Sequence, residues 1–146
     1  MSTQPTDDIL TVLHELAHLM RTRFDQRARL QDMTRAQWVI LLKLERHPGL
    51  TQNEVANMIE VEPITVARLV DRLQAKGMVE RRHDPDDRRV WRLHLLPGAE
   101  PILREITVAR AEMMTHLLGD NVDPDALAKT ATTLRLMKLN LTADAS

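Results

Sequence analysis

Apolar residues recur at intervals of three or four positions over most of the chain, and this spacing predicts amphipathic helices. The first predicted helix covers residues 9–28. Its apolar positions are Ile9, Leu10, Leu13, Leu16, Ala17, Met20 and Phe24. A second helix, 35–46, is expected to begin after Thr34 as its N-cap and to end at the sequence HPG, residues 47–49.

Two shorter helices are predicted next. Thr51 and Glu54 have the spacing of a capping box, which indicates a helix that starts here and ends before residues 60–62. Pro63 suits the first position of the following helix, because its missing N–H is no loss there, and Gly77 is a good terminator. Only residues 60–62 join the two helices. So short a joint forces a sharp crossing and predicts a helix-turn-helix.

After Gly77 the apolar period changes from helical to two. Residues 78–82 and 90–95 are expected to pair as a hairpin around the tip DPDDRR, residues 84–89. Helical spacing resumes at Pro97 and lasts until Gly119, and the sequence DPD at 123–125 begins a final helix. This order predicts a mainly α fold with a small β-wing, a winged helix-turn-helix with flanking helices.

Composition narrows the class of protein. The 146 residues contain one Phe, two Trp and no Tyr, so the core must be aliphatic. There is no cysteine, which excludes disulfides, Cys-ligated zinc and thiol chemistry. The first eight residues are polar and acidic, unlike a signal peptide, and no apolar run approaches the ~18 residues that cross a bilayer. We therefore expect a soluble, cytoplasmic protein without a membrane partner.

The charges are unevenly distributed although the net charge is only −1. Residues 21–46 carry seven basic against three acidic side chains, and residues 62–94 carry eight against six. Basic groups that share one face can bind nucleic acid despite an acidic total, but each run can equally be a solvated helix surface.

The predicted helix 63–76 carries candidate DNA contacts. If its apolar stripe faces inward, then Ile64, Thr65, Arg68 and Arg72 project outward. Arginine can grip guanine in the major groove and an apolar group can meet a thymine methyl. The hairpin adds five arginines, which are Arg81, Arg82, Arg88, Arg89 and Arg92. The tip aspartates are expected to shape the turn and to hold the tip arginines, Arg88 and Arg89, for DNA binding. The alternative is a solvated hairpin with self-cancelling charges.

Three segments carry a specific resemblance. They are TVARLVDRLQAKGMVERR at 65–82, DPDDRR at 84–89 and VWRLHL at 90–95. Together they resemble the multiple-antibiotic-resistance regulator (MarR) family of winged helix-turn-helix repressors. MTRAQWVIL at 33–41 and AEPIL at 99–103 bring the chain nearest to the SlyA-like branch. Two departures are Leu96, where the family usually has a threonine, and Glu62, a poor N-cap.

The resemblance implies a sequence-specific homodimeric regulator, expected to be a repressor on an inverted-repeat operator of double-stranded DNA. Thr65 and Arg68 would enter the major groove, and Arg89, supported by Asp87, the minor groove. The full predicted DNA-contact set is Thr51, Gln52, Pro63, Ile64, Thr65, Arg68, Arg72, Asp87, Arg88 and Arg89. One domain is expected in three parts: an N-terminal dimerisation helix (1–32), the DNA-binding lobe (33–96) and C-terminal dimerisation helices (97–146).

SlyA-like proteins have a cleft for small aromatic anions between the dimer helices and the DNA-binding lobe. The residues that match this cleft are His18, Met33, Trp38, Met113 and His116. An aromatic or acyl-conjugate effector is therefore expected. The alternative is that Trp38 is a core residue and the methionines fill gaps.

Residues 14–18, HELAH, match the zinc-protease pattern H-E-x-x-H. A small zinc hydrolase using His14, Glu15 and His18 is therefore the alternative function of a different class. The position of the extended motif's third ligand is Phe24, so we predict no catalytic residue, metal or cofactor. A winged-helix module used only for protein contacts is a third reading.

Overall fold

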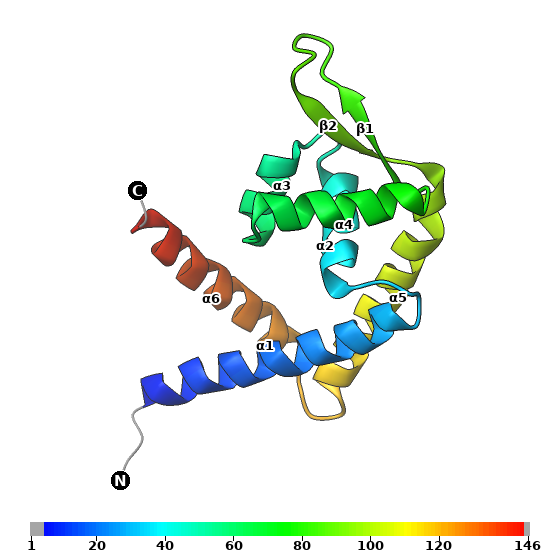
Figure 1. The fold of residues 1–146 in the computed structure, drawn as a ribbon. Coiled ribbons are helices and arrows are strands. Elements are labelled where there is room, and N and C mark those ends of the chain that lie inside the picture. Colours follow the sequence, from blue (N-terminus) through cyan, green and yellow to red (C-terminus); the bar gives the residue numbers. More distant parts are fainter. Residues whose placement is uncertain (1–4, 145–146) are drawn as a thin grey trace. The chain divides into compact units, whose positions relative to one another are not determined.

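The computed structural model describes residues 5–144 (Figure 1). Its elements are α1 (Pro5–Arg29), α2 (Arg35–Arg46), α3 (Gln52–Ile59), α4 (Pro63–Ala75), β1 (Val79–His83), β2 (Trp91–Leu95), a 3-10 turn η1 (Pro97–Ala99), α5 (Glu100–Leu118) and α6 (Pro124–Ala143). The predicted order of elements and the mainly α class with a β-wing are confirmed.

Side-chain caps fix where the two helices after α1 begin. Thr34 Oγ1 accepts a hydrogen bond from Gln37 N at 3.1 Å, and Gln37 Oε1 accepts one from Thr34 N at 2.9 Å. Thr51 and Glu54 repeat this reciprocal box at the start of α3. Each box satisfies amides that a helix start leaves unpaired. The sequence prediction of both starts is therefore confirmed.

Helices α2, α3 and α4 pack with the hairpin around an aliphatic core. Fully buried members include Ile40 and Leu41 of α2, Leu73 of α4 and Leu93 of β2. Trp38 is also inside, with only 2% of its surface exposed. This core holds α4 with one face inward and the other free.

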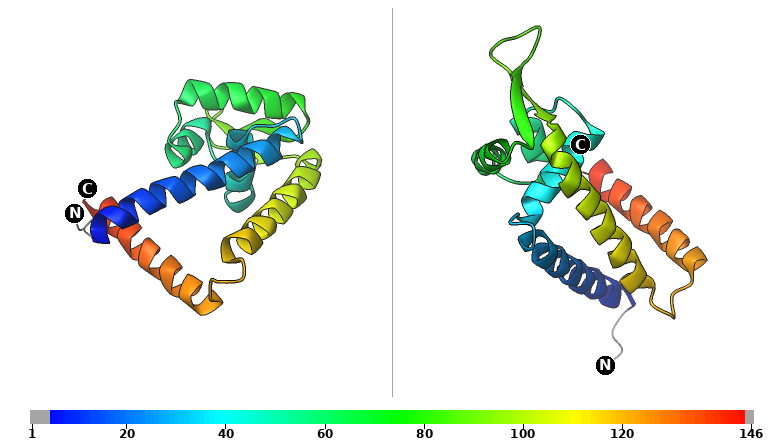
Figure 2. Two further views of the ribbon diagram at one scale, coloured as in Figure 1. Left: turned by 90° about the horizontal axis from the view of Figure 1, so that it is seen from below. Right: turned by 90° about the vertical axis from the view of Figure 1, so that its right-hand side faces the viewer.

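The hairpin projects beyond α4 as a wing (Figure 2, right). Its antiparallel register runs from Val79↔Leu95 to His83↔Trp91. The outer edge of β2 is covered by the α2–α3 loop, because Gly49 N donates to Leu93 O and Leu93 N donates to Leu50 O. The base of the wing is therefore anchored to the core while its tip extends freely.

The chain divides into two compact units, Met1–Ala109 and Arg110–Ser146, with the division inside α5. In the first unit, α1 presents exposed apolar side chains such as Leu10, Val12 and Leu19. In the second unit, α6 has no buried residue, and Leu134, Leu136, Leu139 and Leu141 are exposed. Both helices thus carry apolar surface without cover in a single chain. No helix in the described part of the chain is long and apolar enough to span a membrane.

Candidate nucleic-acid interface

The outer face of α4 bears a row of exposed side chains. Ile64, with 64% of its surface exposed, Thr65, Arg68 and Arg72 all lie on this face, as the apolar spacing predicts. The guanidinium groups of Arg68 and Arg72 make no hydrogen bond or ion pair with any residue that the structure describes. The row therefore offers free cationic and apolar groups on a rigid helix.

The start of α4 lacks a side-chain cap. Glu62 is the N-cap residue and makes no capping bond, and Pro63 occupies the first turn. Pro63 has no N–H, and Thr65 N already donates to Glu62 O at 3.0 Å, so this helix start offers an anion the Ile64 amide and the positive end of the helix dipole. A phosphate at this end would accept the hydrogen bond that the Glu62 side chain does not accept.

A hollow of about 530 Å³ separates the start of α3 from the wing. Its lining consists of Thr51, Gln52, Asn53, Arg81, Arg89, Val90 and Trp91. The structure therefore brings three members of the predicted contact set, Thr51, Gln52 and Arg89, to one concave surface. Asn53 and Trp91 join them, and the linear sequence gave no signal for either.

The wing tip is held by its aspartates. Asp84 Oδ1 accepts from the amides of Asp86 and Asp87 at 2.7 and 3.1 Å. Asp87 grips Arg89 with both oxygens, Oδ1 to Nε at 3.1 Å and Oδ2 to Nη2 at 3.2 Å. The Arg89 side chain is nevertheless 91% exposed. The expectation that Asp87 supports Arg89 agrees with this geometry, which fixes one end of the side chain and leaves its outer edge free.

These contacts keep the tip charged. The side-chain hydrogen bond from Arg92, with that of the Asp86 amide, lowers the pKa of Asp84 below its ordinary value. The hydrogen bonds from Arg89 lower the pKa of Asp87 in the same way. Both carboxylates are therefore ionised at neutral pH and can hold their arginines.

Two of the five hairpin arginines bind within the fold instead of pointing outward. Arg81 donates to Gln52 Oε1 at 2.8 Å, to Gln74 Oε1 at 2.6 Å and to Ala67 O at 3.2 Å, and it pairs with Asp71 at 2.7 Å. It thus ties β1 to α3 and α4. Arg81 is not in the predicted DNA-contact set, and the four acceptors around its guanidinium give it a role within the fold.

Arg92 is the second internal arginine. Its guanidinium donates to Asp84 Oδ2 and, at 2.9 Å, to Gly49 O, and it lies 3.8 Å from Glu54. It therefore links the tip, the α2–α3 loop and α3. Arg82 pairs with Glu80 on the exposed side of β1. The other two hairpin arginines, Arg88 and Arg89, lie in the tip, residues 84–89.

Comparison with known proteins identifies the fold. The sequence model of the MarR family matches residues 33–91. YsmB of Bacillus subtilis, an HTH-type transcriptional regulator, is 30% identical over 128 residues, which are 86% of this chain and 88% of YsmB. The repressor MdtR of the same organism is 29% identical over 91% of this chain and 86% of its own. The crystal structure of the transcriptional regulator PA3341 superposes with a TM-score of 0.80 at 30% identity, covering 92% of this chain and 98% of that one.

The chain belongs to the MarR family. It is a DNA-binding transcriptional regulator with a winged helix-turn-helix. In MarR-family terms α4 is the recognition helix and the β1–β2 hairpin is the wing.

The residues predicted for a MarR-type effector cleft lie in different surroundings. Trp38 is in the core, and its Nε1 is buried without a hydrogen-bond partner among residues 5–144. Met33 is 4% exposed and lines a pocket beside α4, whereas His18 is exposed on α1. Met113, which is buried, and His116, which is exposed, belong to the second unit. The cleft therefore stays a prediction.

His14, Glu15 and His18 line a shallow pocket on the surface of α1 together with Leu19. Among the residues that the structure describes, no group of three His, Cys, Asp or Glu side chains could hold a metal ion. The two histidines of this MarR-family chain thus have no third ligand in that part of the chain, and the zinc-hydrolase alternative receives no support.

Proposed function

We propose that the protein is a homodimeric repressor that binds an inverted-repeat operator and leaves it when a small effector binds. The observation that carries the proposal is the outer face of α4, where Arg68 and Arg72 have no partner among the residues that the structure describes, together with a wing tip that holds Arg89 outward. The finer assignment to the SlyA-like branch and the location in the cytoplasm stay predictions.

Each surface suits a different part of the duplex. Ile64, Thr65 and Arg68 present a methyl-rich group, a hydroxyl and a guanidinium, which match base edges in the major groove. The narrow tip with Arg89 suits the minor groove, where negative potential is concentrated. Asp87 holds Arg89 in place, and we assign the other predicted contacts to the sugar–phosphate backbone. They are Thr51, Gln52, Pro63, Arg72 and Arg88, which lie at helix starts or at surface cations.

The dimer follows from uncovered apolar surface. Helix α6 is 20 residues long and buries none of its side chains. In proteins most of the stability of a helix comes from packing its apolar face, so α6 needs an apolar partner. A second copy supplies the same surface by two-fold symmetry and brings a second recognition helix.

The absence of cysteine and the predicted cleft both favour a small-molecule effector. With no cysteine, the chain cannot sense oxidants through a thiol. A bound small molecule, aromatic or with an acyl group, is the proposed signal. It must bind the DNA-free arrangement of the two recognition helices better than the DNA-bound one, by about 1.4 kcal/mol for each tenfold loss of affinity.

The test is selection of DNA from a random pool by the purified protein, followed by hydroxyl-radical footprinting. We expect two symmetric half-sites about one helical turn apart, roughly 34–36 Å. We also expect the logarithm of affinity to fall steeply with the logarithm of salt concentration, because arginine–phosphate contacts release counterions. Recovery of no preferred sequence, or protection of a single half-site by a monomer, would overturn the proposal.

A further inference from the structure

Trp91 is an exposed aromatic side chain at the start of β2, directly after the wing tip. The chain has two tryptophans, and the other one, Trp38, lies in the core with 2% of its surface exposed. Trp91 exposes 46% of its surface and lines the hollow between the start of α3 and the wing. A tryptophan combines a large apolar ring with an N–H donor, so an exposed one suits a partner that has both apolar and polar groups.

The ring of Trp91 is held in place by a neighbour on the other strand. His83, its partner in the register of the hairpin, stacks on it with ring centroids 3.7 Å apart and an angle of 30° between the planes. His83 is itself anchored, because its Nδ1 donates to Arg88 O at 2.9 Å. The stack covers one face of the indole, so the exposed surface of Trp91 belongs to the other face and the ring edge. A ring that is already ordered loses little conformational entropy on binding.

The hollow around Trp91 is lined by hydrogen-bond donors. Arg81 Nε donates to Gln52 Oε1 at 2.8 Å, which leaves the amide nitrogen of Gln52 as a donor. This nitrogen, the Asn53 amide and the Trp91 N–H have no partner among the residues that the structure describes. Arg89 adds a guanidinium that is 91% exposed. Among the described residues of the lining, only arginines carry a charge. The hollow therefore favours a partner that accepts hydrogen bonds and carries negative charge.

We propose that Trp91 is a direct contact to the DNA backbone and that the hollow holds one phosphate. The indole N–H and the Gln52 amide donate to phosphate oxygens, and the free face of the indole packs on the adjoining deoxyribose. A phosphate suits these groups because its oxygens accept from several donors, and the carbon atoms of the sugar offer the ring an apolar surface. This assignment deepens the proposed function, on which it rests, by adding a neutral contact beside the cationic ones.

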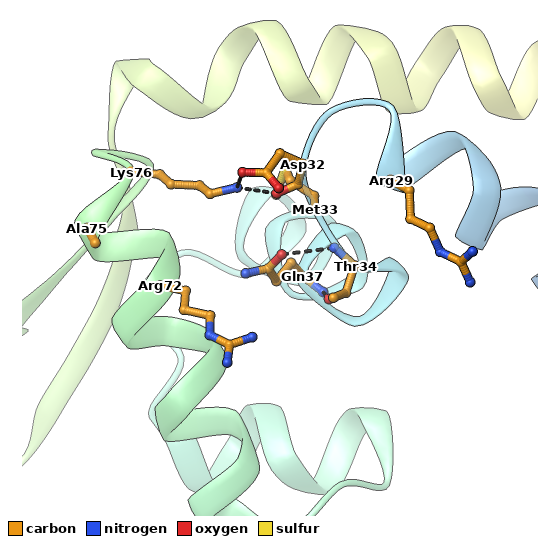
Figure 3. A pocket seen from close by; sticks show the side chains of 8 residues that line it. All are labelled: Arg29, Asp32, Met33, Thr34, Gln37, Arg72, Ala75 and Lys76. Carbon is orange, nitrogen blue, oxygen red and sulfur yellow. Dashed lines mark hydrogen bonds and ion pairs between the residues drawn. The ribbon is translucent and has the colours of Figure 1, made fainter.

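A neutral contact differs from an arginine contact in its response to salt. The slope of log affinity against log salt counts the phosphates that cationic side chains neutralise. Trp91→Phe keeps an apolar ring but removes the N–H, so it should weaken operator binding about tenfold, as expected for a lost hydrogen bond to a charged group, and leave the slope unchanged. Arg72 extends from α4 without a partner among the described residues (Figure 3) and gives the ionic comparison. Arg72→Gln should reduce the magnitude of the slope by about one.

Thermal melts check that both variants fold. Wild-type affinity in Trp91→Phe would overturn the hydrogen bond from the indole. A slope that falls in Trp91→Phe as much as in Arg72→Gln would mean that the substitution displaces a cation, and this outcome would overturn a neutral contact.

Fluorescence of the full chain tests whether DNA covers the ring. Acrylamide should quench mainly Trp91 in the free protein, because Trp38 is buried. Saturating operator should reduce this quenching toward the level of Trp91→Phe, in which only Trp38 emits. Quenching of Trp91→Phe itself should be the same with and without operator, which makes it the control. Saturated binding, shown by anisotropy of labelled DNA, with quenching of Trp91 unchanged would overturn the contact.

Modified DNA tests which phosphate is held. A methylphosphonate, which replaces one phosphate oxygen with a methyl group, is placed in turn at each position of the half-site that the footprint protects. At the phosphate in the hollow, this change should weaken binding by a larger factor in wild type than in Trp91→Phe, because effects on two groups that touch are not additive. Equal factors in the two proteins at every position would overturn the hydrogen bond.

The failure of this proposal can be told apart from the failure of the function on which it rests. If operator is selected and bound while Trp91 stays open to acrylamide, the contact fails and the proposed function stands. If no preferred sequence is selected but random duplex DNA protects Trp91, the operator function fails and the contact stands. If no duplex DNA protects Trp91 and none is selected, both fail.

Discussion

At the scale of single residues, the wing tip makes the sharpest prediction. Arg89→Ala should weaken operator binding by about 1–3 kcal/mol, because the exposed guanidinium would be lost from the minor groove. Stability should be unchanged, since the side chain supports no core. Affinity titration at fixed salt and a thermal melt measure the two quantities. Tight binding equal to wild type would mean that the tip does not touch DNA.

The matched comparison is Arg68→Ala on α4. That side chain is expected to read a base edge, so its loss should relax base preference in a repeated DNA selection. Arg89→Ala should lower affinity for all sequences while the preferred bases within the major-groove half-sites persist. The same pattern of loss in both variants would remove the distinction between the two contacts.

His94 gives the protein a pH-dependent stability. Burial, followed by the nearby charge of Arg82, lowers its pKa below the ordinary value of 6.5. The unfolded chain therefore takes up a proton at a higher pH than the folded chain, and the free energy of unfolding falls as pH drops below about 6.5. His94→Gln should flatten this dependence. Denaturant titrations between about pH 7.5 and pH 5 measure it, and an unchanged slope in the variant would contradict it.

At the scale of elements, Arg81 should act on DNA binding without touching DNA. Arg81→Leu removes the tie from β1 to Gln52 and Ala67, so the wing loses its fixed angle to α3 and α4. We expect a loss of about 1 kcal/mol or more in operator affinity, together with lower stability. The slope of log affinity against log salt should stay as in wild type. In Arg89→Ala the magnitude of this slope should fall by about one, which corresponds to the loss of one phosphate contact. A fall of that size in Arg81→Leu would make Arg81 a DNA contact.

The elements themselves could be predicted because their signals are local. The Thr34 and Thr51 boxes, Pro63 at the start of α4 and the change of period after Gly77 each act within a few residues. The outward face of α4 followed from the same spacing. Resemblance to the family added the fold, whereas the role that it implies for the tip stays a prediction.

The partners of the hairpin arginines could not be predicted from the sequence. Arg81 finds Ala67 O and Gln74 only after β1 folds back on α4, and Arg92 finds Gly49 O across 43 positions. Long-range contacts of this kind leave no spacing in the sequence.

At the scale of the whole molecule, the assembly state is testable on α6. Leu134→Glu places a charge on its apolar stripe, and Thr133→Glu places the same charge one position away on its polar side. We expect wild type and Thr133→Glu to be dimers at micromolar concentration by sedimentation equilibrium. Leu134→Glu should raise the dissociation constant at least about tenfold, because burying a charge costs more than 1.4 kcal/mol. Equal dissociation constants would place the dimer contact elsewhere.

Since α6 has no buried residue in its own chain, the proposed dimer would make the lifetime of the protein depend on its concentration. In the proposed dimer the C-terminal segment gains its apolar cover by mass action, so dilution should unfold it before the core of α2, α3 and α4 opens. A protease present in dilute solution would then cut within α6 first, and at higher concentration the same cut would slow. At a low cellular concentration a larger fraction of the regulator would be open to proteases. Its half-life in the cell would therefore become shorter as its concentration falls.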